Sequence, residues 1–305
     1  MRVTANFINI LLLIVLGYAL KRFGLLKAQD SHVLSALVLN VTLPALVIVN
    51  LNKAHIDVSL TLLPVLMIVY GVIAKGIVIW LFIKYSNQVR GAVGMMMASL
   101  NIGIFAYPLV AQIWPDKGLL YFGMVDIGGA LIMYGVTYFV AGYFSQGTNQ
   151  FNVRYLCRSI VTSVPLMTYM IMLVLNVLDF RLPHNVVRFF DMLGQANLPL
   201  SMILLGLLLN FSIERSLLPL TIKYLVVHYG IGILAGLAVY FFLPVTDDMI
   251  KTTLILTWLL PVGVSVIPFA VKFRYQMMPF IVMTTNITII ISIIILYAYQ
   301  ALFMH

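Results

Sequence analysis

The residues from Asn101 to Pro108, NIGIFAYP, interrupt a long apolar stretch of the sequence, and the residues from Pro261 to Pro268, PVGVSVIP, interrupt another stretch 160 residues further along. Both strings have a glycine at the third position and a proline at the eighth. Proline lacks a backbone N–H and clashes with the preceding helical turn, whereas glycine tolerates the dihedral angles of an unwound stretch. One such string alone would indicate a simple kink. Because the pattern recurs at matched positions, it predicts that two membrane helices are locally unwound.

The composition excludes a soluble protein. The chain has 305 residues, of which 63% are hydrophobic and 9% charged, whereas a soluble globular domain has about 25% charged residues. A membrane-spanning helix needs roughly 20 apolar residues, so the chain has room for about ten spans. The net charge of +9 comes from basic residues scattered between apolar runs, without the basic stripe of a nucleic-acid-binding protein. The sequence therefore predicts a polytopic membrane protein that contacts membrane lipid and no nucleic acid.

The apolar runs predict an all-α fold with ten transmembrane helices. The first run ends in Lys21 and Arg22 without a small-residue cleavage site, so we interpret it as a retained span rather than a signal peptide. The predicted spans, numbered 1 to 10 in chain order, are residues 3–20, 32–51, 58–83, 89–114, 119–144, 159–179, 186–211, 216–243, 249–271 and 278–303.

Matched motifs indicate that the two halves of the chain repeat one unit. Thr42-Leu-Pro44 in span 2 matches Asn197-Leu-Pro199 in span 7, 155 residues later. Leu62-Leu-Pro64 in span 3 matches Leu217-Leu-Pro219 in span 8 at the same distance. Each match is weak alone, because proline is common in membrane helices. Together with the two glycine–proline strings of spans 4 and 9, they predict an internal repeat.

The two halves are predicted to enter the membrane in opposite directions. Residues 1–145 and 159–305 each hold five predicted spans, and residues 146–158 form a predicted cytoplasmic loop between them. Because five is odd, the second half is inverted relative to the first, as in many secondary transporters. The 160-residue offset also places Asp126 of span 5 on Asn286 of span 10.

The loop charges predict the orientation of the chain in the membrane. With the N-terminus outside, the loops on the cytoplasmic side hold ten Lys and Arg residues and the opposite side holds six. Cytoplasmic loops of membrane proteins are enriched in Lys and Arg. Both termini are therefore expected outside the cytoplasm.

The unwound stretches are the predicted substrate site. Non-helical backbone exists at membrane depth only where it is buried in protein or lines a wet cavity. If the two broken helices cross, their half-helix N-termini present N–H groups and positive dipole ends to one cavity, which suits an anion. Ser265 would add a side-chain donor, whereas Asn197 either lines the path or hydrogen-bonds between helices. The predicted substrate-binding residues are Asn101, Gly103, Pro108, Pro261, Gly263, Ser265, Pro268 and Asn197.

Three further residues are predicted to couple transport or balance charge, namely Asp126, Asn286 and Lys75. Asp126 is the only acidic residue well inside a predicted span. A carboxylate there marks a proton relay, an ion ligand or the partner of a cation, which here would be Lys75 or Lys223. Lys75 alternatively extends its ammonium group to the interface. His228 is either a proton shuttle or a hydrogen-bonded packing residue.

The sequence shows no pattern of an enzyme, a metal site or a cofactor site. The five histidines lack the spacing of metal ligands, and Cys157 is the only cysteine. The Gly-x-Ser-x-Gly nucleophile motif and the phosphate-binding loop of ATP-driven transporters are absent. We therefore expect no catalytic residues, no metal, no cofactor and no hydrolysis of ATP.

Several stretches of the chain resemble the auxin efflux carrier family, which contains plant auxin exporters and bacterial permeases for malonate and malate. The resemblance extends over nearly the whole chain, and its most specific parts are Asn101, Gly103 and Pro108 of span 4 and Asp126 with Gly128 of span 5. The stretches are LVLNVTLPALVI, SLNIGIFAYPLV, FGMVDIGGA, NLPLSMILLGLLL and LPVGVSVIPFAVKF.

The resemblance implies a fold and a mechanism. It implies that spans 4 and 9 cross, that spans 3–5 and 8–10 form a mobile transport domain, and that spans 1, 2, 6 and 7 form a scaffold. It also implies elevator-type alternating access and a homodimer joined through the scaffold. The short central loop is similar to that of the small bacterial members, which act in the plasma membrane. Ala106 and Gly129 depart from the residues common in the family, which are Gly and Asn.

The sequence thus predicts a secondary carrier for a small organic anion, a mono- or dicarboxylate. A sodium-coupled carrier like the bile acid symporters is an alternative, in which Asp126, Asn101 and Asn286 would supply oxygen ligands. A membrane sensor or channel that binds a ligand without turnover is a second alternative.

Overall fold

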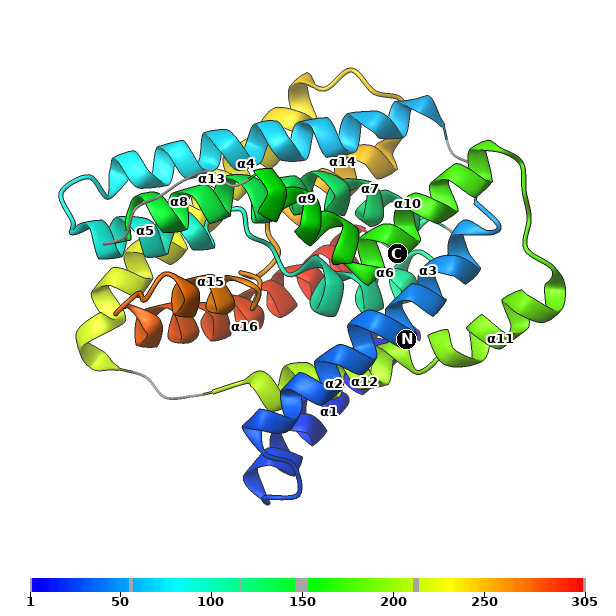
Figure 1. The fold of residues 1–305 in the computed structure, drawn as a ribbon, viewed down its shortest axis with the longest axis horizontal. Helices are drawn as coiled ribbons and strands as arrows, with labels where there is room; N and C mark the ends of the chain where they lie inside the picture. Colours follow the sequence, from blue (N-terminus) through cyan, green and yellow to red (C-terminus); the bar gives the residue numbers. More distant parts are fainter. Residues whose placement is uncertain (1, 55–56, 116, 146–152, 211–213, 304–305) are drawn as a thin grey trace.

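The described chain is all-helical, apart from short connections and the interrupted segments described below. The computed structural model describes residues 2–54, 57–115, 117–145, 153–210 and 214–303, and Figure 1 shows the helices arranged as a bundle. Residues 146–152 of the predicted central loop lie outside the described residues, and residues 153–158 belong to a helix.

The first half of the chain forms α1 (Arg2–Arg22), α2 (Ser31–Leu37), η2 (Val38–Thr42), α3 (Leu43–Leu51), α4 (Leu62–Leu81), α5 (Asn87–Met96), η4 (Ile102–Ala106), α6 (Tyr107–Ile113), α7 (Gly118–Leu131), η5 (Ile132–Thr137) and α8 (Tyr138–Tyr143). The second half forms α9 (Val153–Thr162), α10 (Val164–Val177), α11 (His184–Gly194), α12 (Asn197–Leu208), α13 (Leu218–Phe242), α14 (Asp248–Thr257), α15 (Val266–Lys272) and α16 (Met278–Phe303). Short 3-10 turns are η1 (Ala28–Asp30), η3 (Val58–Thr61) and η6 (Arg215–Leu217), whereas η2, η4 and η5 are π-helical.

Within the described residues, six helical stretches are long and apolar enough to cross a membrane. They overlap predicted spans 2, 3, 5, 7, 8 and 10, and are Ser31–Leu51, Val58–Leu81, Gly118–Tyr143, His184–Leu208, Arg215–Phe242 and Met278–Ala301. The other predicted spans fall on α1 and on three pairs of shorter helices, α5 with α6, α9 with α10, and α14 with α15. The helices fit a protein that crosses a membrane several times. The count of ten crossings and the inverted repeat stay predictions.

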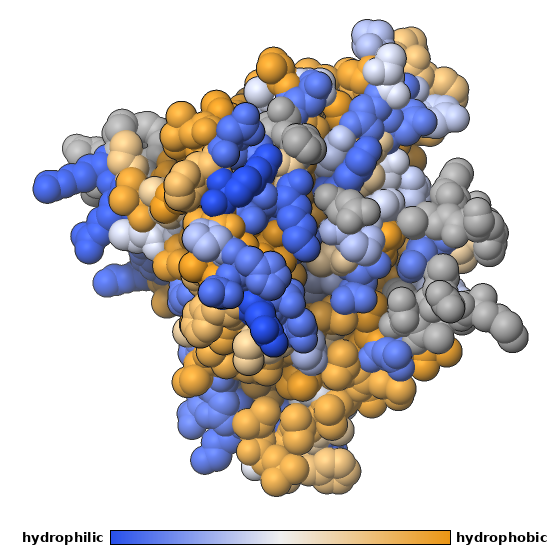
Figure 2. Space-filling view, turned by 90° about the vertical axis from the view of Figure 1, so that its right-hand side faces the viewer, coloured by the Kyte–Doolittle hydropathy of each residue, from blue (hydrophilic) through white to orange (hydrophobic). Residues whose placement is uncertain are grey.

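The surface of the bundle is suited to lipid. Large apolar side chains are exposed along α4 and α13, among them Val65, Ile73, Val226 and Leu234. In water such exposed faces would be costly, but in a bilayer they meet hydrocarbon. Figure 2 shows one face of the molecule, on which polar residues gather in the upper and middle part and apolar residues cover most of the lower part.

The helices pack as two groups. In the first group α1 packs on α12, and α3 packs on α10 and α11. In the second group α4 packs on α7, α5 on α8, and α13 on α14 and α16. The groups touch where η4 and α6 meet α12, where α7 meets α3 and α10, and where η5 meets α9. These boundaries position the cavity described below.

Glycines bring α1 and α12 into close contact. A Cβ atom at Gly206 would lie 2.0 Å from the backbone oxygen of Ile14, and one at Gly17 would lie 2.1 Å from that of Ile203. Small residues of this kind allow close approach of membrane helices, which gain dispersion contacts along the seam. At both glycines the atom that an added methyl group would meet belongs to the backbone, so a change of side-chain rotamer cannot make room for it.

We predict that Gly206→Ala destabilises the first group of helices. Overpacking of this kind costs about 1–3 kcal/mol, so the thermal unfolding midpoint of the detergent-purified protein should fall. Gly230→Ala in α13 is the matched control, because no atom lies within 4 Å of the added Cβ. Equal midpoints for the two variants would contradict the close packing of α1 on α12.

Candidate functional site

Two interrupted helices meet at the centre of the second group. Helix α5 ends at Met96 and residues 97–101 are not helical, while α14 ends at Thr257 and residues 258–265 are not helical. Leu100 and Val262 face each other in an antiparallel bridge. The two segments therefore pair with each other across 160 residues of sequence.

Backbone hydrogen bonds hold this pairing together. The N–H of Asn101 donates to the carbonyl oxygen of Pro261 at 2.9 Å, and the N–H of Gly263 donates to that of Ser99 at 2.7 Å. The N–H of Val262 donates to Thr288 Oγ1 at 3.1 Å. Each unwound segment thus supplies hydrogen bonds to the other, which satisfies backbone groups that a helix would otherwise pair.

The first unwound segment lies further toward the N-terminus than the sequence pattern indicates. The predicted unwinding around Gly103 and Pro108 is wrong in position, since residues 102–106 are π-helical and Pro108 lies in the first turn of α6. Proline is tolerated there because a first-turn N–H has no partner in its own helix. Pro268 likewise lies in the first turn of α15, whereas Gly263 is in the unwound segment. The prolines therefore lie early in the second half-helices, after the unwound segments rather than inside them.

A cavity of about 290 Å³ lies at this crossing, between the two groups of helices. The first group contributes η2, the start of α3 and the joint between α9 and α10, and the second contributes the unwound segments, η4 and α7 with η5. The lining residues include Leu39, Asn40, Leu43, Met67, Ser99, Leu100, Asn101, Ile102, Gly103, Ile104, Asp126, Gly129, Ala130, Met133, Tyr134, Thr162, Ser163, Val164, Pro165, Leu166, Gly263 and Ser265.

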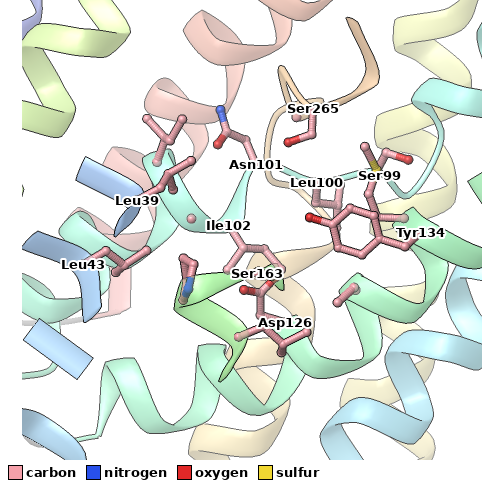
Figure 3. Close-up of a pocket in the computed structure, with 18 of the residues that line it drawn as sticks. Leu39, Leu43, Ser99, Leu100, Asn101, Ile102, Asp126, Tyr134, Ser163 and Ser265 are labelled. Carbon is pink, nitrogen blue, oxygen red and sulfur yellow. The ribbon is translucent and has the colours of Figure 1, made fainter. Parts of the chain in front are cut away.

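Hydrogen-bond donors gather on one side of the cavity. Asn101 is only 5% exposed, and its side-chain nitrogen has no hydrogen-bond partner within the described part of the chain. Ser265 lies on the same side (Figure 3). Gly103 is in the first turn of η4, where backbone N–H groups have no partner in their own helix. A buried donor without a partner carries a free-energy cost that a bound acceptor would remove.

Asp126 brings a carboxylate to the opposite side of the cavity, as Figure 3 shows. The hydroxyl of Tyr107 donates a hydrogen bond to its Oδ2 atom at 2.8 Å. None of the described residues lining the cavity is Lys, Arg or His. The cavity thus pairs a donor-rich side with a carboxylate that no cationic lining residue neutralises.

Five of the predicted site residues line this cavity, and six do not. Those in the lining are Asn101, Gly103, Gly263, Ser265 and Asp126. The others lie outside the lining, and are Pro108, Pro261, Pro268, Asn197, Asn286 and Lys75.

The two asparagines outside the lining form hydrogen bonds between and within helices. The side chain of Asn197 donates to Thr42 Oγ1 at 3.1 Å and so joins α12 to η2. The side chain of Asn286 accepts a hydrogen bond from the N–H of Asn210 at 3.0 Å and donates to the carbonyl of Val282 at 2.8 Å. Of the two interpretations open for Asn197, the structure favours the interhelical hydrogen bond.

Lys75 caps the end of an interrupted helix. Its side chain is 1% exposed, so it does not extend to the interface. Its ammonium group donates to the carbonyls of Gly94 (3.0 Å), Met95 (3.4 Å) and Met97 and to Ser99 Oγ (3.3 Å). These carbonyls form the negative end of α5. The partners found for Lys75 are therefore helix carbonyls rather than Asp126.

A basic side chain also reaches the second interrupted helix. Nε2 of His228, on α13, lies 3.3 Å from the carbonyl oxygen of Leu260 in the unwound segment. Lys223, the other possible partner of Asp126, lies over the rings of Phe82 and Tyr85 instead.

The sequence pattern did not identify several residues of the cavity. Tyr107 lies outside the lining but donates a hydrogen bond to Asp126; it is inside the quoted string of span 4, where it looks like an ordinary apolar position. Thr162 to Leu166 enter the lining because the helix of predicted span 6 is interrupted at Ser163. Ser163 and Pro165, which lie two residues apart, were the signal in the sequence for this break, since proline favours the first turn of a new helix.

Comparisons with known proteins agree with the membrane character of the chain. Residues 2–299 match the family described as membrane transport protein. An uncharacterized transporter of Methanothermobacter thermautotrophicus is 29% identical over 218 residues, which cover 70% of each chain. An uncharacterized transporter of Methanocaldococcus jannaschii is 25% identical over 212 residues, which cover 66% of this chain and 67% of the relative.

We predict that Lys75→Met destabilises the crossing, because buried carbonyls of α5 lose their donor at about 1–3 kcal/mol for each unsatisfied group. Methionine keeps the length and the apolar stem of lysine. The thermal unfolding midpoint of purified Lys75→Met should lie below that of Lys223→Met, a control that also removes one ammonium group. If Lys75→Met is as stable as the control, the capping role is wrong.

Proposed function

The chain belongs to the membrane transport protein family, to which the auxin efflux carriers it resembles also belong, and from this premise we propose that it is a secondary carrier for small organic anions that bear a carboxylate. Transport, rather than catalysis, is the function that the family and the transporters related to it share. The proposal adds the substrate class, the site and the mechanism.

The cavity at the crossing carries the proposal. It combines the unpartnered amide of Asn101, the first turn of η4 at Gly103 and the hydroxyl of Ser265. Backbone N–H groups and helix N-termini bind carboxylates and other anions well, because the helix dipole adds a favourable field. We therefore assign the substrate carboxylate to this side of the cavity.

Asp126 is the proposed coupling or charge-balancing group. A carboxylate at membrane depth is costly unless a proton, an ion or a cationic group accompanies it. Asp126 lines the same cavity as the proposed anion site, so its charge and that of the substrate affect each other through a medium of low dielectric constant.

The two groups of helices provide the proposed moving parts. The cavity lies at their boundary, and sliding of the second group along the first would carry it from one side of the membrane to the other in an elevator-type cycle. We further propose a homodimer joined through the first group, location in a bacterial plasma membrane, and both termini outside the cytoplasm.

The experiment is counterflow in liposomes that contain the purified protein. We expect saturable exchange of a labelled carboxylate against the same unlabelled acid, without a requirement for sodium. Asp126→Asn should change both the exchange rate and its pH dependence, because it removes the only carboxylate among the described lining residues. Asp30→Asn, in the short η1 turn before α2, is the matched control and should leave exchange unchanged.

Other outcomes would overturn parts of this proposal. Absence of saturable counterflow with every carboxylate tested would reject the carrier. A strict sodium requirement would favour a sodium-coupled symporter, and binding without exchange, or single-channel currents, would favour a sensor or channel. Unchanged rates and pH dependence in Asp126→Asn would reject the coupling role of Asp126.

A further inference from the structure

The carboxylate of Asp126 has no cationic side chain to pair with among the described residues that line the cavity, since none of them is Lys, Arg or His. A substrate carboxylate at the donor-rich side would bring a second negative charge into the same enclosed space. Like charges repel strongly where water is scarce, so a positive charge has to accompany the substrate, as a proton, as an ion or as part of the substrate itself.

The space beside Asp126 is open toward such a group. Oδ2 of Asp126 accepts the hydroxyl of Tyr107. A Cβ atom added at Gly129 would stand 3.6 Å from Oδ1 of Asp126 and 3.5 Å from Cδ1 of Ile102, which is ordinary van der Waals contact. Gly129 also lines the cavity and has no side chain that could cover Oδ1. A ligand group inside the cavity can therefore approach Oδ1 past Gly129.

The two polar sides of the cavity are separated. Figure 3 shows Asn101 and Ser265 on one side and Asp126 on the opposite side, while Leu39 and Leu43 lie on a third. A ligand that spans the cavity therefore meets Asn101 and Ser265 at one end and the two leucines along one flank. At the other end it meets the carboxylate of Asp126, with Ser163 beside it.

We propose that the substrate is a zwitterionic amino acid, whose carboxylate binds near Asn101, Gly103 and Ser265 and whose ammonium group binds Asp126 beside Gly129. The inference rests on the proposed function, because it takes a carboxylate as the group bound at the crossing. It goes beyond the class of organic anions, because a zwitterion pairs its carboxylate with its own positive charge. A dicarboxylate would place its second carboxylate against Asp126.

The test is competition by a series of acids that differ only in the group at the end opposite the carboxylate. Pentanoate, 4-aminobutanoate and glutarate share three methylene groups between the carboxylate and a terminal methyl, ammonium or second carboxylate group. Shorter and longer homologues of each acid vary the distance between the ends. Each compound competes for counterflow of a labelled member of the series in liposomes that contain the full-length protein.

We expect the best amino acid to compete on the order of tenfold or more better than the methyl-terminated acid of equal length, since a buried charge pair loses this much when one partner is removed. The dicarboxylate should compete least. Asp126→Asn should abolish the preference for the ammonium group, and Gly129→Ala should weaken it because its methyl group lies beside Oδ1 of Asp126.

Gly76→Ala is the control for Gly129→Ala, since no atom lies within 4 Å of a Cβ atom at Gly76. It should leave the order of the acids unchanged.

Equal or better competition by the methyl-terminated acid or the dicarboxylate overturns this inference and leaves the carboxylate carrier intact, whereas exchange with no member of the series contradicts the proposed function itself. A preference for the ammonium group that persists in Asp126→Asn also overturns the inference.

Discussion

Non-helical backbone inside a membrane has to find its hydrogen-bond partners within the protein, and the crossing of the two interrupted helices meets this constraint. The segment before η4 and the segment before α15 pair with each other at Leu100 and Val262, and Thr288 pairs with the N–H of Val262. Neither interruption would be stable at this depth without the other. The pairing joins the chain at the residues where the two similar strings begin, Asn101 and Pro261.

The carbonyl ends and the N–H ends of the interrupted helices differ in their hydrogen-bond partners, and this difference produces the site. Lys75 and His228 meet carbonyl oxygens at the ends of the first half-helices, so these acceptors have partners inside the protein. The beginnings of the second half-helices face the cavity instead, where Gly103 and Ser265 are in the lining. On this side of the cavity donors are thus available to a ligand and the helix carbonyls are not, which favours a negatively charged or acceptor group there.

Part of this arrangement could be predicted from the sequence. The repeated glycine–proline strings indicated where two helices are interrupted, and a single carboxylate within an apolar span pointed to Asp126, which lies in the cavity lining. The position of the first break was missed because Pro108 begins a helix rather than ending one. The partners of Lys75 could not be predicted, because they are backbone carbonyls brought together only by tertiary structure. The contribution of Thr162 to Leu166 was missed because the break at Ser163 and Pro165 lies close to the start of an apolar run that reads as one continuous span.

Disulfide cross-linking between two introduced cysteines tests directly whether the two unwound segments lie side by side. Leu100 and Val262 form a non-hydrogen-bonded antiparallel pair, in which Cα atoms are typically about 4.5 Å apart, within disulfide range. In a Cys157→Ser background, Leu100→Cys with Val262→Cys should form an intrachain disulfide in membranes under mild oxidation. Leu100→Cys with Val271→Cys, whose second position is exposed on α15, should not. Failure of the facing pair to cross-link, or equal cross-linking of both pairs, would contradict the crossing on which the site depends.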